Sequence, residues 1–175
     1  EEELAEIVTN GSEKLDLDFE EQAIRAIENL SAGYPHFTHL LALKCAEDAI
    51  AQDRSRISLR DLNHALNAAV QDAEGTLKLL YDTAVRSYQA ADMYRLIVRA
   101  AAYCATPTSE FTSRELREKI KLFSGETVSQ QVLNNYFKKL VSDGEDKILQ
   151  RLAMGVYRFS DPRMPSFVRI VEGKL

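Results

Sequence analysis

The chain has 175 residues, of which 45% are hydrophobic and 28% charged, a composition typical of globular domains. This length suits one medium domain or two small ones. No apolar run approaches the roughly 18 residues needed to cross a bilayer, and the acidic start, Glu1 to Glu3, lacks the basic character of a signal peptide. We therefore expect a cytoplasmic protein that does not contact a membrane.

The formal charge differs between the two halves. Residues 1–93 carry 8 Lys and Arg against 18 Asp and Glu, whereas residues 94–175 carry 14 against 9. Such asymmetry indicates two modules, the second of which has enough positive charge to meet a polyanion.

The first half reads as helices throughout. Apolar residues at helical spacing predict a helix over residues 2–9, which Gly11 is expected to end. Asp18 and Glu21 have the spacing of a capping box. In this motif two residues at a helix start exchange side-chain to backbone hydrogen bonds. A second helix is therefore predicted to begin there and to stop near Gly33.

Three further helical segments complete the first half and lead into the second. Pro35 suits the first turn of a helix that continues to about Asp53, because its fixed φ and missing N–H cost nothing there. Ser58 and Asp61 resemble a capped start of the next helix. Periodic apolar residues then predict another helix over residues 76–91.

From Met93 the pattern changes to three helices followed by two short strands. The helices are predicted at residues 94–104, at 112–123 after a capping box, and at 129–141. The strand-like runs at 148–151 and 156–159 are joined by a loop that contains a glycine, as hairpin loops often do. This order is that of a winged helix.

The predicted fold is thus mainly α, with a small β-hairpin wing. We expect an α-helical bundle over residues 1–92 and a winged-helix domain over residues 93–175, whose last part is an amphipathic segment from Met164.

The third helix of the winged helix would serve as the recognition helix of a helix-turn-helix variant. Its polar face and the wing offer groups for base edges and phosphates, namely Gln131, Asn134, Asn135, Lys138, Lys139, Arg151 and Arg158. Asp143, Glu145 and Asp146 follow this helix and would repel phosphate, and many winged helices dock proteins instead. DNA and a protein partner therefore both remain open.

Catalytic motifs are missing from the sequence. It has no phosphate loop of the form Gly-x-x-x-x-Gly-Lys-Ser/Thr, no apolar strand ending in paired acids, and no Gly-x-Gly-x-x-Gly. We therefore expect no enzyme activity from these residues alone. His36 and His39 share a helix face, but no further ligand is apparent, so we expect no metal. Cys45 and Cys104 are interpreted as reduced thiols.

Two segments carry a family resemblance. Leu30-Ser-Ala-Gly-Tyr-Pro-His-Phe37, followed by Ile57-Ser-Leu-Arg-Asp-Leu62, resembles the lid region of AAA-type P-loop ATPases. The likeness is closest to the branch with Gly-x-Pro in place of an arginine sensor, as in STAND signalling ATPases, and to origin-initiator ATPases. The runs 148–151 and 157–162 resemble the wing and closing segment of the winged helix that follows such lids. The resemblance spans nearly the whole chain.

This resemblance implies a lid that closes over nucleotide bound to an ATPase core, which these residues lack. The corner formed by Gly33, Tyr34 and Pro35 would lie against base and sugar, and His36 would sense phosphate near a helix N-terminus. No arginine occupies the corner, so the arginine-sensor role has no carrier there. ATP or ADP would bind only in the full-length parent, and the winged helix would pass the nucleotide state to DNA or to a protein.

Two other functions compete with this one. The second hypothesis is a self-contained winged-helix DNA-binding regulator whose helical half dimerises, and the third is an adaptor that only docks proteins. A phosphate loop encoded upstream of Glu1 would separate the ATPase from the regulator. Salt-dependent binding to arbitrary duplex would count against the adaptor, because phosphate contacts produce a steep salt dependence.

Overall fold

The computed structural model describes residues 2–72, 75–87, 89–105, 110–142 and 147–173. It is mainly helical with a small sheet, as the sequence predicted. The chain forms two compact units: the first comprises residues 1–73 and 169–175, and the second residues 74–168. Helix α9 (Met164–Glu172) crosses this division, because its residues up to Val168 belong to the second unit and those from Arg169 to the first.

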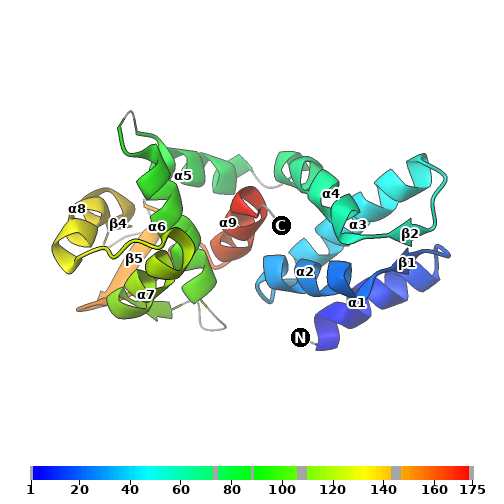
Figure 1. Ribbon diagram of the computed structural model, residues 1–175, viewed down its shortest axis with the longest axis horizontal. Helices are drawn as coiled ribbons and strands as arrows, with labels where there is room; N and C mark the ends of the chain where they lie inside the picture. The colour runs from blue at the N-terminus through cyan, green and yellow to red at the C-terminus, as the bar shows by residue number, and fades with distance from the viewer. Residues whose placement is uncertain (1, 73–74, 88, 106–109, 143–146, 174–175) are drawn as a thin grey trace. The chain divides into compact units, whose positions relative to one another are not determined.

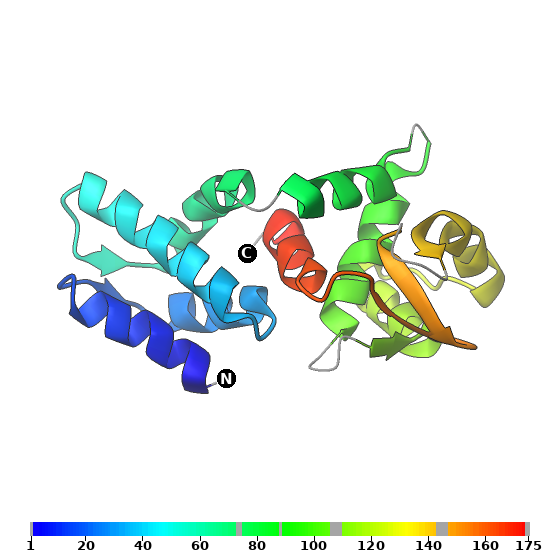
Figure 2. The same ribbon diagram turned by 180° about the vertical axis from the view of Figure 1, so that it is seen from behind.

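Helix α3 is the centre of the first unit (Figures 1 and 2), where it packs against three other helices. The four helices are α1 (Glu2–Glu13), α2 (Glu21–Ser31), α3 (Pro35–Ala51) and α4 (Leu59–Asp72). The core side chains of α3 include Phe37, Leu41, Cys45 and Ala49, all of which are buried. Burial, with the nearby Asp61 and Asp48 charges, raises the pKa of the Cys45 thiol to about 12, which disfavours the nucleophilic thiolate.

A short parallel strand pair holds the starts of α2 and α4 together. Strand β1 (Asp18–Phe19) pairs with β2 (Arg56–Ile57), which places Phe19 beside Ile57. Both of these side chains are buried. The Asp18 N–H donates to the Ser55 carbonyl at 2.7 Å, so the backbone of Asp18 is used in strand pairing.

Two sequence predictions in this unit are wrong. Helix α1 does not end at Gly11 but continues to Glu13, since Gly11 itself has helical geometry. Asp18 does not cap α2, because it lies in β1, and the N-cap residue is Glu20, whose side chain makes no capping hydrogen bond. The capped start at Ser58 is confirmed: both its N–H and its hydroxyl donate to Asp61 Oδ2.

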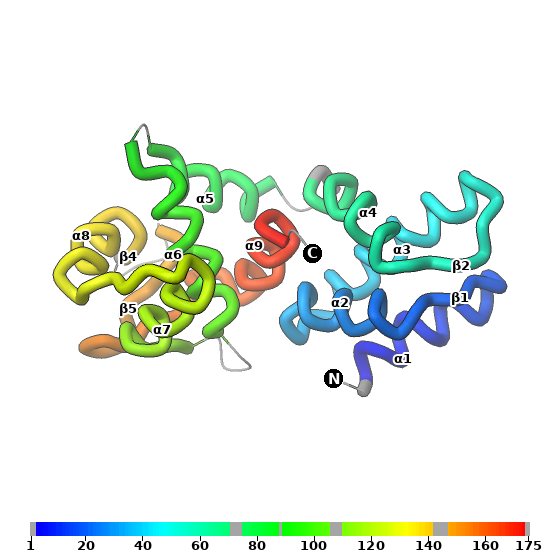
Figure 3. The backbone as a smooth tube through the Cα atoms, viewed as in Figure 1, coloured from blue at the N-terminus to red at the C-terminus, as the bar shows by residue number. Residues whose placement is uncertain are grey.

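The second unit has the winged-helix order, which Figure 3 lets the reader follow along the chain. Its helices are α5 (Gly75–Val85), α6 (Ala91–Cys104), α7 (Ser113–Ser124) and α8 (Gln130–Leu140). Its sheet runs in the order β3 (Glu110–Thr112), β6 (Val156–Phe159), β5 (Leu149–Ala153) and β4 (Val141–Ser142). The first three strands are antiparallel, and β4 pairs with β5 in parallel.

The helix predicted over residues 76–91 is shorter than expected, because α5 ends at Val85. Beyond it the Ser87 hydroxyl accepts a hydrogen bond from the Ala90 N–H, which replaces a helical bond by a local turn. Helix α5 belongs to the second unit, where Tyr81 meets Phe167 edge to face at 5.9 Å. The compact units therefore divide before α5, whereas the sequence-based boundary lies after it.

Arg169 is a buried cation within the first unit. Its side chain is 4% exposed, and Nη1 donates to the Asn29 carbonyl at 2.6 Å, near the end of α2. A helix C-terminus attracts positive charge, because its last carbonyls carry partial negative charge. Gly173 leaves no room for a side chain, since a Cβ added there would lie 2.3 Å from the Arg169 carbonyl oxygen and 2.9 Å from Leu30 Cδ2. Residues 169–173 therefore pack against α2 in the first unit.

We predict that Arg169→Met destabilises the first unit by about 2 kcal/mol, because the buried Arg169 side chain loses its charge-assisted hydrogen bond to the Asn29 carbonyl. Amide hydrogen exchange in α2 should report the loss. Arg25→Met is the control: Arg25 forms an exposed ion pair with Glu21 one turn away, and such pairs contribute little. Equal exchange in the two variants would contradict this role of Arg169.

Candidate functional site

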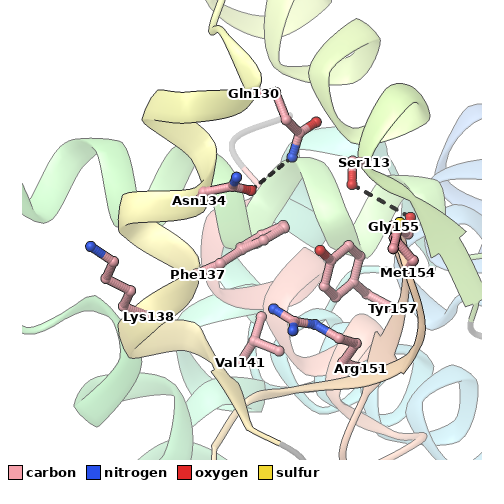
Figure 4. A pocket seen from close by; sticks show the side chains of 10 residues that line it. All are labelled: Ser113, Gln130, Asn134, Phe137, Lys138, Val141, Arg151, Met154, Gly155 and Tyr157. Carbon is pink, nitrogen blue, oxygen red and sulfur yellow. Dashed lines mark hydrogen bonds between the residues drawn. The ribbon is translucent and has the colours of Figure 1, made fainter.

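A groove of about 940 Å³ lies between α8 and the hairpin formed by β5 and β6, which we term the wing (Figure 4). It is lined by Ser113, Gln130, Asn134, Phe137, Lys138, Val141, Arg151, Met154, Gly155 and Tyr157. Within the described part of the chain this lining includes two cations and two carboxamides but no carboxylate. Its polar groups therefore suit an anionic partner.

Two aromatic rings form the floor of the groove. The ring centroids of Phe137 on α8 and Tyr157 on β6 lie 4.5 Å apart, and both side chains are buried. Phe111 on β3 pairs with Tyr157 across the sheet, and its ring centroid lies 6.1 Å from that of Tyr157, so it extends the cluster on the same sheet face. Helix α8 turns Phe137 inward because its apolar residues recur at helical spacing, with Leu133 and Leu140 also buried. This packing fixes α8 against the wing.

The first turn of α8 is held by side-chain hydrogen bonds. The Ser129 hydroxyl accepts from the Val132 N–H at 3.3 Å and caps the helix. Gln130, the first residue of α8, donates from Nε2 to Oδ1 of Asn134, one turn further along the helix, at 2.9 Å (Figure 4). This bond fixes the Asn134 carboxamide at the edge of the groove, with its amide donors left for a partner.

The turn of the wing is anchored to the start of α7. The Ser113 N–H donates to the Gly155 carbonyl at 2.9 Å, and the Ser113 hydroxyl donates to the same oxygen at 3.4 Å. Gly155 has a φ of 76°, a conformation that favours glycine. The preceding capping box is confirmed, since Glu115 Oε2 accepts from the Thr112 N–H at 2.7 Å and from its hydroxyl at 2.8 Å.

Three of the residues proposed to contact DNA meet at the groove: Asn134, Lys138 and Arg151. Arg151 lies over the Tyr157 ring at 6.0 Å from its centroid, which is expected since the two residues pair directly across the hairpin. Gln131 and Asn135 are exposed on α8 but do not line the groove.

Lys139 and Arg158 are placed differently. Lys139 donates to the Arg86 carbonyl and lies 4.5 Å over the Tyr94 ring, so it braces α8 against the segment after α5. Burial and then the Arg86 charge lower the pKa of Lys139. Arg158 follows Tyr157 and points to the opposite sheet face, where its Nε donates to Gln150 at 2.9 Å.

The remaining lining residues were not singled out as functional from the sequence. The sequence positions of Ser113, Phe137 and Tyr157 indicate structural roles only. Tertiary packing brings these three residues to one groove. The hairpin was predicted without a register, and the structure sets Arg151 opposite Tyr157. The acids Asp143, Glu145 and Asp146, which argued against phosphate, lie outside the described residues.

The corner between α2 and α3 forms the second candidate site. Ala32 and Gly33 have positive φ values of 50° and 88°, which turn the chain sharply after α2. Pro35 is the first residue of α3, as predicted, and Tyr34 is its N-cap residue without a side-chain capping bond. Gly33, Pro35 and His36 are exposed, and Tyr34 is half-buried. The corner is thus presented to solvent.

Comparison with family models, with curated proteins and with solved structures found no match for this chain. Over its described residues, none of the helices combines the length and apolarity needed to traverse a bilayer. The same residues contain no cluster of three or more His, Cys, Asp or Glu side chains placed to hold a metal ion. The candidate sites therefore rest on geometry and sequence.

We predict that Glu115→Gln removes part of the acid dependence of the second unit's stability. The Thr112 N–H and hydroxyl lower the pKa of Glu115 below its ordinary value of 4.5. A lowered carboxyl pKa stabilises the fold fully above the ordinary value, and the contribution is lost as pH falls through the folded-state value.

Because Glu115 is exposed, the variant should lose only about 0.5 kcal/mol at pH 7, the scale of a weakened helix cap, and should show a flatter decline below pH 4.5. Urea unfolding at several pH values, followed by circular dichroism, measures both. Glu118→Gln is the control, because Glu118 forms an exposed pair with Arg114 on the same helix. An unchanged acid limb in Glu115→Gln would contradict the capping role.

Proposed function

We propose that this chain is the lid and winged-helix end of an AAA-type ATPase. In this proposal the first unit closes on nucleotide bound to a core that precedes residue 1, and the winged helix contacts duplex DNA. The observation that carries the DNA part is the groove beside α8, which gathers Asn134, Lys138 and Arg151 without a carboxylate among its described lining residues.

The groove chemistry favours nucleic acid. Lys138 and Arg151 supply charge for phosphates, and the Arg151 guanidinium lies on the same side of the sheet as the Tyr157 ring, 6.0 Å from its centroid. Gln131, Asn134 and Asn135 present carboxamides from one helix, and carboxamides are the side-chain groups that pair with adenine in the major groove. The two cations would thus supply most of the affinity for DNA. The carboxamides of α8 would determine which base pairs the helix contacts.

The lid part of the proposal rests on the exposed corner together with the family resemblance. Pro35 starts α3, so the positive end of this long helix opens at the corner, and His36 is exposed beside it. Base and sugar would lie on Tyr34 and Pro35, and ATP or ADP would bind only when the core is present. Hydrolysis would belong to the core, and we place the whole protein in the cytoplasm.

A self-contained DNA-binding regulator is the second candidate. Leu15, Leu43 and Ile50 are more than half exposed in the first unit, and such side chains favour burial between two copies of the chain. In this reading the helical unit would dimerise and would not bind nucleotide. The upstream coding sequence separates the two functions, since only the ATPase requires a phosphate loop there.

We predict that Lys138→Ala and Arg151→Ala each weaken binding to arbitrary duplex DNA about tenfold. Each should reduce the slope of log affinity against log salt by about 1, because each removes one phosphate contact. Fluorescence anisotropy at several salt concentrations measures both quantities. Lys121→Ala is the matched control, because this exposed lysine lies in the last turn of α7, away from the groove.

Salt-independent binding, or equal losses in the Lys121 variant, would contradict the groove as the DNA site. Binding of a protein to the winged helix without any affinity for duplex would support the docking adaptor instead.

We predict that Pro35→Ala and His36→Ala weaken nucleotide binding by the intact polypeptide about tenfold, because the corner contacts the nucleotide. Equilibrium binding of a fluorescent ATP analogue measures the effect. His39→Ala is the control, since His39 is exposed on the same helix one turn further from the corner. An intact polypeptide without a phosphate loop, or equal effects of both histidines, would overturn the lid proposal.

A further inference from the structure

The tip of the wing carries three consecutive apolar residues that are exposed. Leu152 is 40% exposed, Ala153 is exposed, and Met154 is 99% exposed. Single exposed apolar side chains are common. A run of three at the end of a hairpin is less so, and because these side chains are not buried they contribute no hydrophobic stabilisation to the fold. The tip therefore has apolar character that packing within the described residues does not explain.

The tip is held in place by its neighbours. The pairing of β5 with β6 shifts register between Arg151 and Ala153, so Leu152 is the extra residue of a β-bulge. Bulges redirect side chains, and here Arg151, Leu152 and Ala153 are all exposed in succession. At the other side of the tip, Gly155 is bound by Ser113 through both N–H and hydroxyl. The apolar tip is thus pre-formed.

One cation adjoins the tip and a second lies across the groove from it. Arg151 comes directly before Leu152 in the sequence, and Lys138 lines the same groove from α8, on the side opposite the tip (Figure 4). No carboxylate belongs to the described lining of that groove. An apolar projection beside a cation suits a partner with an anionic surface and an apolar interior. Duplex DNA is such a partner, because its phosphates lie outside and its stacked base pairs lie inside.

We propose that the wing tip is an apolar wedge that inserts Met154, supported by Leu152, between base pairs in the minor groove of bound duplex. This inference rests on the proposed DNA-binding function and adds to it a mode of recognition. The flexible, unbranched side chain of Met154 fits an opened base step, and Arg151 holds the adjacent phosphate.

A protein partner fits the tip less well. Stable protein interfaces bury about 800 Å² on each partner, whereas the tip offers three residues. A wedge needs only one or two apolar side chains, because most of its affinity comes from phosphate contacts around it. Insertion would select flexible pyrimidine–purine steps and bend the duplex, so sequence preference would arise without base hydrogen bonds at that step.

The test uses this chain with a duplex that carries 2-aminopurine, a base whose fluorescence rises on unstacking, at a central TA step. We expect the wild type to raise the fluorescence and to bind the TA duplex about fivefold more tightly than a duplex with a stiff A-tract. Met154→Ser should abolish the rise and the preference while leaving the salt slope unchanged. Met154→Leu should retain both.

Leu122→Ser is the matched control, because Leu122 is 73% exposed on α7 of the same unit and does not line the groove. Circular dichroism verifies that each variant is folded. If Met154→Ser matches the wild type in fluorescence and preference while duplex binding stays salt-dependent, the wedge is wrong and the DNA-binding function stands. If the wild type binds no duplex at all, both proposals fall.

Discussion

The contact between the rings of Phe137 and Tyr157 determines the shape of the winged helix. One ring comes from α8 and the other from the wing, so their packing at 4.5 Å sets the distance between the two elements that line the groove. Because Phe111 continues the cluster, β3 joins the same aromatic layer. The polar residues on either side reach one groove only because this apolar layer fixes their backbones.

Local signals predicted most of the helices correctly, since their starts are set by neighbouring residues. The Thr112 capping box, the Ser129 cap and Pro35 at the first position of α3 all act within one turn. The signals that failed were equally local. Asp18 has the right spacing for a cap, but its N–H donates to the carbonyl of Ser55, a residue distant in sequence, so Asp18 lies in a strand and not at a helix start.

The short strands could not have been predicted, because two or three residues do not establish an alternating pattern. Strands β1 and β2 depend on Phe19 and Ile57 meeting in the core, and β3 depends on pairing with β6 far along the chain. The same holds for Arg169, whose sequence context is that of an exposed helix residue. Its burial against the Asn29 carbonyl arises entirely from tertiary structure.

The candidate DNA site was predictable as a face but not in detail. Lys138 lines the groove, whereas Lys139 donates to the Arg86 carbonyl. Sequence alone cannot distinguish these two lysines, because neighbouring residues of a helix differ only in the direction in which their side chains leave the helix axis. Alternation along β6 separates Arg158 from the groove in the same way, since it places Tyr157 on the groove side. The wing tip was recognisable only as a glycine-containing loop.

An NMR titration of the ¹⁵N-labelled chain with a short duplex tests directly whether DNA binds in the groove. If it does, amide shifts change in α8 and in the wing from Arg151 to Gly155, and the changes shrink as salt rises. Shift changes confined to the helices of the first unit, or no changes at low salt, would contradict DNA binding in the groove.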